Sequence, residues 1–236
     1  MDNVKQYVIW TLQNENIESL FNLYTIKFNP NNFLKITNNF DTEKSILFTN
    51  TKSNQSFKFT FELFEFEAII ENIIPIIVNE AYRVAKQLSD EPIDEDIETV
   101  DKVEKLIELR ISSFYSYILY DDSYKDFLKY DVIFLTSYII EGFIKRHLLT
   151  NGNKRLIYAL LNVMLLIFSS LYIKWSFQDD SIYKTEKNYE RFKYDKIYTN
   201  EIIKWVELSH LNDPENAFRL TEVIIDFIFN NCLLKF

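Results

Sequence analysis

A short polar segment between two long apolar runs carries the residue types best suited to chemistry: His147, Gly152, Lys154 and Arg155. The whole chain holds only two His and two Gly, and this segment contains one of each. An imidazole accepts a proton near neutral pH, a glycine lets the main chain approach a ligand closely, and Lys and Arg neutralise phosphate oxygens. Together they predict a site where a di- or triphosphate faces a general base.

Two helices are expected to position this segment. Before it, apolar residues recur at helical spacing, on a face that the imidazole would complete: Val132, Leu135, Ile139, Phe143 and His147. After it, residues 156–175 are mostly apolar and contain neither Gly nor Pro. A buried helix should therefore begin near Asn153 and direct its free N–H groups into the loop, where they favour an anion.

The segment from His147 to Arg155 resembles the Fic/Doc motif, His-x-Phe-x-Asp/Glu-x-Asn-Gly/Lys-Arg. The resemblance implies a catalytic core of a helix, the motif loop and a second helix. Asn153-Lys154-Arg155 is similar to the death-on-curing branch, whose members transfer the γ-phosphate of ATP to a protein hydroxyl. In the AMP-transferring branch, Gly stands where this chain has Lys154. The resemblance thus implies a protein kinase-like toxin, with a translation elongation factor as the target and an antitoxin as a further partner.

The same resemblance implies a role for each matching residue. His147 would be the general base that takes the proton from a Ser or Thr hydroxyl of the target. ATP phosphates would be bound by Gly152, Asn153, Lys154 and Arg155. Asn151 occupies the position of the carboxylate that usually binds Mg²⁺, and its carboxamide oxygen can ligate the ion without adding charge.

Two departures from the motif leave other functions open. Leu149 replaces the Phe that anchors the loop in the core, and Asn151 replaces the acid. One alternative is AMP transfer to a protein hydroxyl. Another is a degenerate Fic-fold module that binds nucleotide or a partner without catalysis. A third is a plain connection between two capped helices.

Fic proteins often carry an inhibitory pattern, Ser/Thr-x-x-x-Glu-Gly/Asn, whose glutamate pairs with the last Arg of the motif. Two segments match it, Thr11 to Asn16 and Ser137 to Gly142. The second lies on the helix that leads into the motif and cannot easily fold back onto Arg155. The first makes Glu15 the candidate inhibitory residue.

Composition limits the class of protein. The 236-residue chain has a net charge of −9 and is 47% hydrophobic, which provides ample material for a core. The acidic balance argues against nonspecific nucleic-acid binding. A single cysteine, Cys232, excludes an internal disulfide, and no signal peptide is evident, so a cytoplasmic location is expected. Polar residues interrupt the apolar run 156–175, so we expect a buried helix and no membrane span.

The predicted fold is mainly α, with a Fic/Doc-like helical bundle over residues 91–236. Residues 1–90 are predicted to form an α+β region with a small sheet or hairpins. The pattern indicates a helix over 4–23, strands over 24–28, 45–51 and 57–64, and a helix over 65–87 that Pro75 kinks. The acidic run 89–96 marks the junction, and the aromatic segment 113–120 is either a flap that adds a strand to a target or ordinary core packing.

Overall fold

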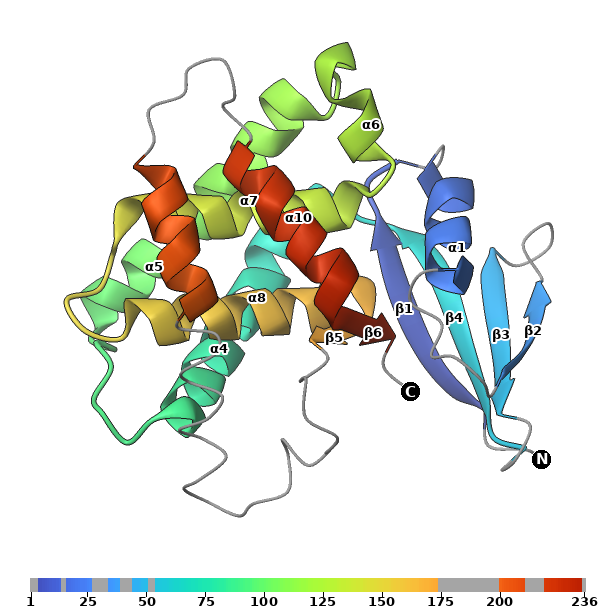
Figure 1. Ribbon diagram of the computed structural model, residues 1–236, viewed down its shortest axis with the longest axis horizontal. Coiled ribbons are helices and arrows are strands. Elements are labelled where there is room, and N and C mark those ends of the chain that lie inside the picture. The colour runs from blue at the N-terminus through green and yellow to red at the C-terminus, as the bar shows by residue number, and fades with distance from the viewer. Residues whose placement is uncertain are drawn as a thin grey trace.

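The computed structural model describes residues 4–13, 16–26, 34–38, 44–50, 54–173, 200–210 and 219–234. Within these ranges the chain is mainly helical, and a four-stranded sheet lies on one side of the helices (Figure 1). The predicted mainly α class with a small N-terminal sheet is confirmed at this level.

The sheet has the strand order β1-β4-β3-β2, with β1 (Lys5–Thr11) parallel to β4 (Ser56–Leu63). Strands β3 (Ser45–Asn50) and β2 (Leu34–Asn38) continue it in antiparallel fashion. Alternate residues of β4 are buried, as a strand with one covered face requires: Phe57, Phe59 and Phe61. The predicted strands over 45–51 and 57–64 are therefore confirmed to within a residue at each end, with residue 51 outside the described ranges.

The expected helix over 4–23 is wrong. These residues form β1 and then, after a short connection, helix α1 (Ile17–Ile26), so the expected strand over 24–28 is wrong as well in its described part. Aromatic and β-branched residues fill β1, which favours a strand, and the partner that fixes it is β4. Helix α1 covers the sheet, where the rings of Tyr24 and Phe61 meet edge to face at 6.1 Å.

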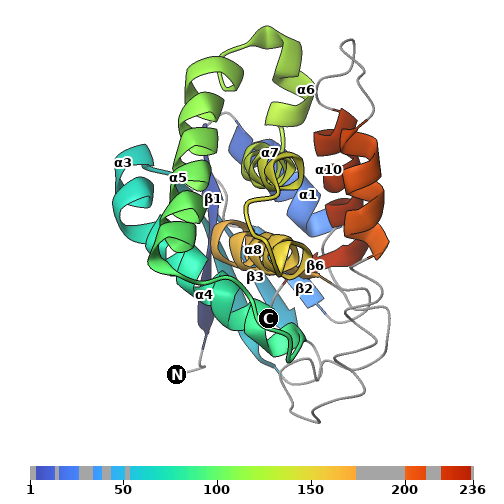
Figure 2. The same cartoon turned by 90° about the vertical axis from the view of Figure 1, so that its left-hand side faces the viewer.

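Helices α7 (Asp131–Arg146) and α8 (Asn153–Ser169) are the central elements of the helical part, because most of their side chains are buried. Figure 2 shows α5 (Ile97–Ser113) and α10 (Arg219–Asn231) on opposite sides of α7, and both contact it. Helix α4 (Ile74–Leu88) packs against α8. A helix over residues 200–209 joins this part, with the ring of Trp205 5.2 Å from that of Phe227.

The predicted helix over 65–87 is confirmed, because residues 66–88 are helical without a break, and the type of helix changes just before the proline. A short helix α3 (Phe66–Ala68) and a π-helical turn η2 (Ile69–Ile73) precede α4. Pro75 lies in the first turn of α4, directly after the π-helical turn. Residues beyond α4 up to Asp96 are not helical, and Asp96 then caps α5 by accepting a hydrogen bond from the Thr99 amide.

The aromatic segment 113–120 is not an extended flap. It forms a π-helical turn, η3 (Phe114–Ile118), in which Phe114 and Ile118 are buried and Tyr117 is exposed. The core-packing interpretation therefore holds for its inward side. A 3-10 turn η4 (Asp122–Tyr124) and a short helix α6 (Lys125–Leu128) lead from it to α7.

Buried polar contacts join the C-terminal end of α8 to the sheet region. The Tyr24 hydroxyl donates to the Ser169 carbonyl at 2.6 Å, and the Ser170 hydroxyl donates to the Val8 carbonyl at 2.8 Å. Next to these, strand β5 (Leu171–Ile173) pairs antiparallel with β6 (Cys232–Leu234). The motif, at the other end of α8, is thus built on a helix with a fixed position.

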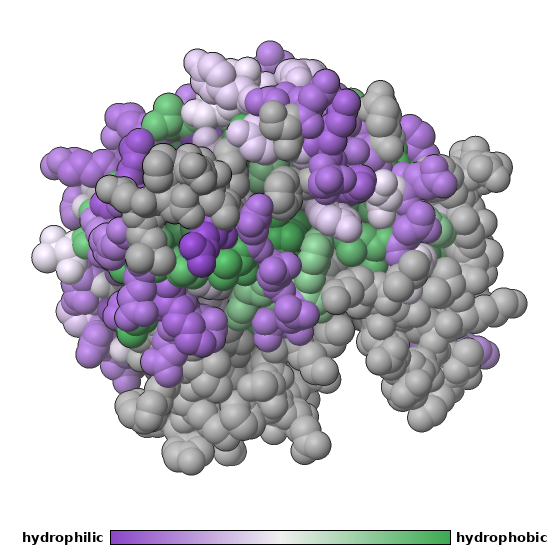
Figure 3. Space-filling view, turned by 45° about the horizontal axis from the view of Figure 1, so that its top comes forward, coloured by the Kyte–Doolittle hydropathy of each residue, from purple (hydrophilic) through white to green (hydrophobic). Residues whose placement is uncertain are grey.

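Among the helices of the described ranges, none is both long and apolar enough to cross a bilayer. Residues 156–169 of the apolar run lie in α8 and are mostly buried between other elements, as expected. Hydrophilic side chains surround a narrower hydrophobic band on the face in Figure 3. The domain division near residue 90 falls in the α4–α5 connection and stays a prediction.

Candidate functional site

The predicted helix, loop and helix around the motif are confirmed. Helix α7 ends at Arg146, and His147 follows in the left-handed conformation, with φ 44° and ψ 61°. Its side chain is exposed. Figure 2 shows α7 and α8 nearly end-on, with the loop that joins them at the front. A left-handed residue after a helix reverses the chain direction, so His147 begins the loop at the surface.

Asn153 holds the loop in shape. Its Oδ1 accepts from the Leu149 amide at 2.9 Å, and its Nδ2 donates to the Leu149 carbonyl. Leu149 itself is only 4% exposed, so this leucine anchors the loop in the core, as expected for the Phe position of the motif. The Asn153 side chain therefore stabilises the loop from within, and its predicted contact with phosphate stays a prediction.

Two consecutive amides of the loop converge on one oxygen. Thr150 N and Asn151 N donate to Asp94 Oδ2 at 2.7 and 3.0 Å. Asp94 N also donates to the Asn151 carbonyl at 3.3 Å. Successive main-chain N–H groups that point at one place form an anion-binding concavity. The loop thus binds an oxyanion through its backbone, and the oxyanion in this structure is the chain's own Asp94.

Arg155 and Gly152 contact the same connection. The Arg155 side chain is 7% exposed, and its two terminal nitrogens donate to the carbonyls of Glu91 and Pro92 at 2.6 and 2.7 Å. Gly152 has φ +95°, and a Cβ built there would lie 2.6 Å from Ile93 Cγ1. Both residues were predicted to bind phosphate. Here residues 91–94, which we call the covering segment, occupy their surroundings.

Lys154 and Asn151 are exposed at the loop surface. In the part of the chain that the structure describes, no group of three or more His, Cys, Asp or Glu side chains could hold a metal ion. Asn151 can contribute one uncharged carboxamide oxygen to a metal ion. This donor set fits Mg²⁺ in part, because that ion usually takes one or two protein ligands and completes its shell with water and substrate phosphates.

Glu15 lies outside the described residues, but its neighbours bind the far end of α7. Thr11 Oγ1, Leu12 N and Asn16 Nδ2 donate to Asp131 Oδ2 at 2.8, 2.7 and 3.2 Å. Asp131 begins the 16-residue α7, whose length is about 24 Å, and the motif follows its other end. Of this segment's described residues, Thr11 ends strand β1, and Thr11, Leu12 and Asn16 lie at the end of α7 that is far from the motif.

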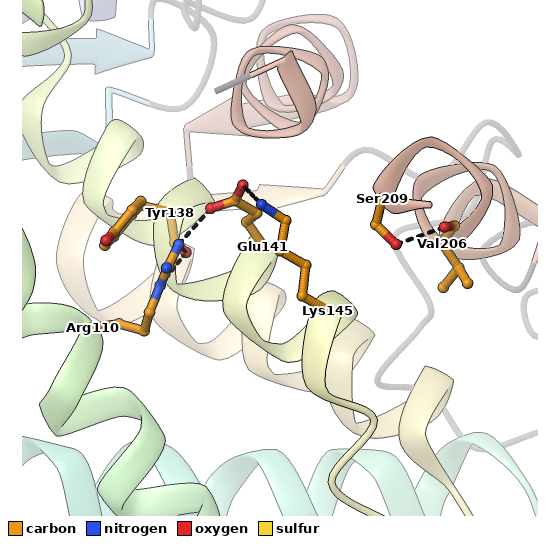
Figure 4. Close-up of polar contacts among 6 residues, drawn as sticks. All are labelled: Arg110, Tyr138, Glu141, Lys145, Val206 and Ser209. Carbon is orange, nitrogen blue, oxygen red and sulfur yellow. Dashed lines mark hydrogen bonds and ion pairs between the residues drawn. The ribbon is translucent and has the colours of Figure 1, made fainter. Parts of the chain in front are cut away.

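The second inhibitory match has a different partner. Glu141 pairs with Arg110 at 2.5 Å and with Lys145 at 2.7 Å, and both contacts are visible in Figure 4. The Arg110 guanidinium also lies over the Tyr138 ring, 3.3 Å from its centroid. Gly142 leaves room for this arginine, because a Cβ there would lie 2.9 Å from its Nε. Glu141 thus joins α5 to α7 and does not reach Arg155.

The sequence does not identify the residues of the covering segment as part of the site, because they lie in the acidic run that it assigns to the domain junction. One signal was available. Pro92 and Ile93 are apolar residues within an otherwise acidic run, and Ile93 is buried. An isolated apolar pair in a charged loop indicates that the loop packs on something.

No protein-family model matches this chain, and comparison with curated proteins and with solved structures found no match.

Proposed function

We propose that this chain is a Fic/Doc-like enzyme that transfers the γ-phosphate of ATP to a Ser or Thr hydroxyl of a target protein. The observation that carries the proposal is the convergence of the Thr150 and Asn151 amides on a single carboxylate oxygen, in a loop that starts with the exposed His147. Backbone donors of this kind also bind phosphate oxygens, because they are fixed in direction and carry positive partial charge.

Four side chains of the motif would have a role in this reaction. His147 would accept the proton of the target hydroxyl while that oxygen bonds to the γ-phosphorus and the bond from phosphorus to the departing ADP breaks. General-base assistance of this type contributes about 10²–10⁴-fold in rate. Lys154 and Arg155 would neutralise the phosphate oxygens, and Asn153 would keep the loop in shape from within.

Magnesium belongs to the proposal as a partner of the nucleotide. Asn151 would be its ligand from the motif, and the phosphates would supply the negative charge that a carboxamide lacks. When bound, the ion would neutralise phosphate charge. Lys154, in the place of the glycine of AMP-transferring relatives, supports phosphate over AMP as the transferred group.

The biological setting follows from the resemblance alone. A death-on-curing-like toxin would act in the cytoplasm on a translation factor and be restrained by an antitoxin. The Fic/Doc-like arrangement of the bundle is part of the same proposal, supported by the buried α7 and α8 on either side of the motif loop.

A second candidate, a binding module without catalysis, is favoured by one specific observation. The amides and the arginine of the loop already have partners within the chain. In that case the Asp94 contact would be a permanent structural link, and no nucleotide would replace it.

Intact-mass analysis tests the proposal. Candidate targets, translation elongation factors first, are incubated with the protein, ATP and Mg²⁺. A mass increase equal to one phosphate is expected. An increase equal to AMP would move the chain to the AMP-transferring branch, and an unchanged mass for every target under conditions where ATP binds would favour the non-catalytic module.

A further inference from the structure

The covering segment, residues 91–94, makes three kinds of contact with the motif loop. The Asp94 carboxylate accepts hydrogen bonds from the amides of Thr150 and Asn151. The Ile93 side chain lies against Gly152. The carbonyls of Glu91 and Pro92 accept hydrogen bonds from the Arg155 guanidinium. Four consecutive residues thus engage backbone donors, glycine and arginine, all parts of the predicted phosphate site.

A phosphate and the covering segment cannot use these groups together. Asp94 Oδ2 lies within hydrogen-bond distance of both amides, which is where a phosphate oxygen would lie. The carboxylate would also repel any phosphate beside it, since like charges at short range disfavour each other. Arg155 is 7% exposed and has to release its two carbonyl partners before it can pair with an incoming anion.

We propose that the covering segment is an internal inhibitory segment, in which Asp94 takes the place of a nucleotide phosphate on the motif loop. The inference rests on the proposed function. An anion of the polyphosphate class, ATP above all, displaces Asp94 and binds the loop amides and Arg155. The apparent affinity for such an anion is the intrinsic affinity multiplied by the fraction of molecules in which the covering segment is displaced.

The ends of the connection limit how far it opens. The C-terminal end is tied to both helices, because Lys86 of α4 pairs with Glu95 and Asp96 caps α5 through the Thr99 amide. Glu91 N is bonded to the Ser89 hydroxyl at 3.2 Å. Displacement is therefore a local movement of residues between two fixed helices, and no helix has to unfold.

The experiment compares three full-length proteins: the natural chain, Asp94→Asn and Glu91→Gln. Both variants remove one negative charge from the same connection. Only Asp94 uses its carboxylate on the loop, because Glu91 binds Arg155 through its backbone carbonyl and its side chain is exposed. Calorimetric titration with ATP and with pyrophosphate measures binding, and hydrogen exchange measures the protection of the Thr150 and Asn151 amides.

Asp94→Asn should bind both anions about tenfold more tightly or better, since hydrogen bonds to a charged acceptor contribute about that factor or more. Its Thr150 and Asn151 amides should exchange faster without ligand and regain protection when pyrophosphate is added. Glu91→Gln should match the natural chain. Equal affinities in all three proteins, or amides that stay equally protected in Asp94→Asn, would overturn the inference.

Target phosphorylation, measured in parallel, separates the two proposals. If Asp94→Asn binds anions more tightly while no protein modifies a target, the inhibitory segment stands and the transfer reaction fails. If the natural chain modifies its target and Asp94→Asn changes neither affinity nor rate, the reaction stands and the inhibitory segment fails.

Discussion

Arg155 donates a 2.7 Å hydrogen bond to the carbonyl of Pro92, a residue 63 positions earlier in the chain. The same guanidinium donates to the Glu91 carbonyl at 2.6 Å, so one buried side chain fixes two consecutive peptide groups. A planar guanidinium with a fork of donors suits this geometry, whereas an ammonium offers a single point of attachment. The arginine of the motif therefore stabilises the covering segment in addition to its proposed role with phosphate.

Arg155→Lys should loosen the covering segment. The variant loses at least one charge-assisted hydrogen bond, so its free energy of unfolding should fall by about 1–3 kcal/mol. The Thr150 and Asn151 amides should exchange faster as Asp94 leaves them. Urea denaturation and hydrogen exchange measure the two effects. Arg146→Lys, the same change at an exposed position, is the matched control and should alter neither. An Arg155→Lys protein with natural stability and protection would contradict the structural role.

Gly152→Ala should destabilise the loop for two separable reasons. Its φ of +95° is unfavourable for alanine, and the new Cβ would lie 2.6 Å from Ile93 Cγ1. We expect a loss of about 1–3 kcal/mol in the free energy of unfolding. An Ile93→Ala background removes the 2.6 Å contact and leaves only Cβ at 3.1 Å, so the same substitution should be less harmful there. If the two effects simply add, Ile93 does not lie against Gly152 in solution.

Asp131→Ala should be among the most damaging single changes in the chain. Thr11, Leu12, Gln13 and Asn16 all donate to one oxygen of this fully buried carboxylate. Thr11 and Asn16 keep a second acceptor on Gln13, but removing the carboxylate takes the acceptor from the Leu12 and Gln13 amides, at a cost on the order of 3 kcal/mol. Denaturant unfolding measures the loss, with Asp126→Ala, at an exposed site paired to Lys129, as the control. Equal stability of the two variants would exclude this network as a main link between β1 and α7.

The helix, loop and helix of the motif could be predicted from sequence for a local reason. Helix α7 is apolar over most of its length, α8 likewise, and Gly152 with its neighbouring asparagines interrupts them. Local pattern therefore determines both helix boundaries. In the N-terminal region the deciding contact is not local, since Gln6 pairs with Lys58 and Trp10 with Glu62 across the parallel β1–β4 register. The helical periodicity of residues 4–23 gives no information about β4, the strand with which residues 5–11 pair.

The site was predictable only in part for the same physical reason. Residue types and spacing made His147 and the loop candidates, and the structure places His147 at the surface and a pair of converging amides in the same loop. The partners of those amides come from the α4–α5 connection, more than fifty residues earlier. Which anion a backbone site holds depends on tertiary packing, so Asp94 could not be inferred from the motif.

Asn151→Asp should lower the Mg²⁺ concentration needed for ATP binding. A carboxylate adds negative charge to a ligand of a hard cation, and it also repels Asp94, whose carboxylate already binds the Asn151 amide. Titration of Mg²⁺ at fixed ATP measures the shift, and Asn151→Ala, which removes the ligand, should need more Mg²⁺ than the natural chain. Identical Mg²⁺ dependence in all three proteins would show that residue 151 is not at the metal.

The most direct measurement follows labelled ATP through the natural chain and through His147→Asn. Asparagine tolerates the left-handed conformation that His147 adopts and cannot act as a base, so the variant should fold normally and lose transfer. With the natural chain, label from the γ-position of ATP should reach the target protein and label from the α-position should not. With His147→Asn, neither should. Label from the α-position on the target, or undiminished γ-label with the folded variant, would contradict phosphate transfer with His147 as the base.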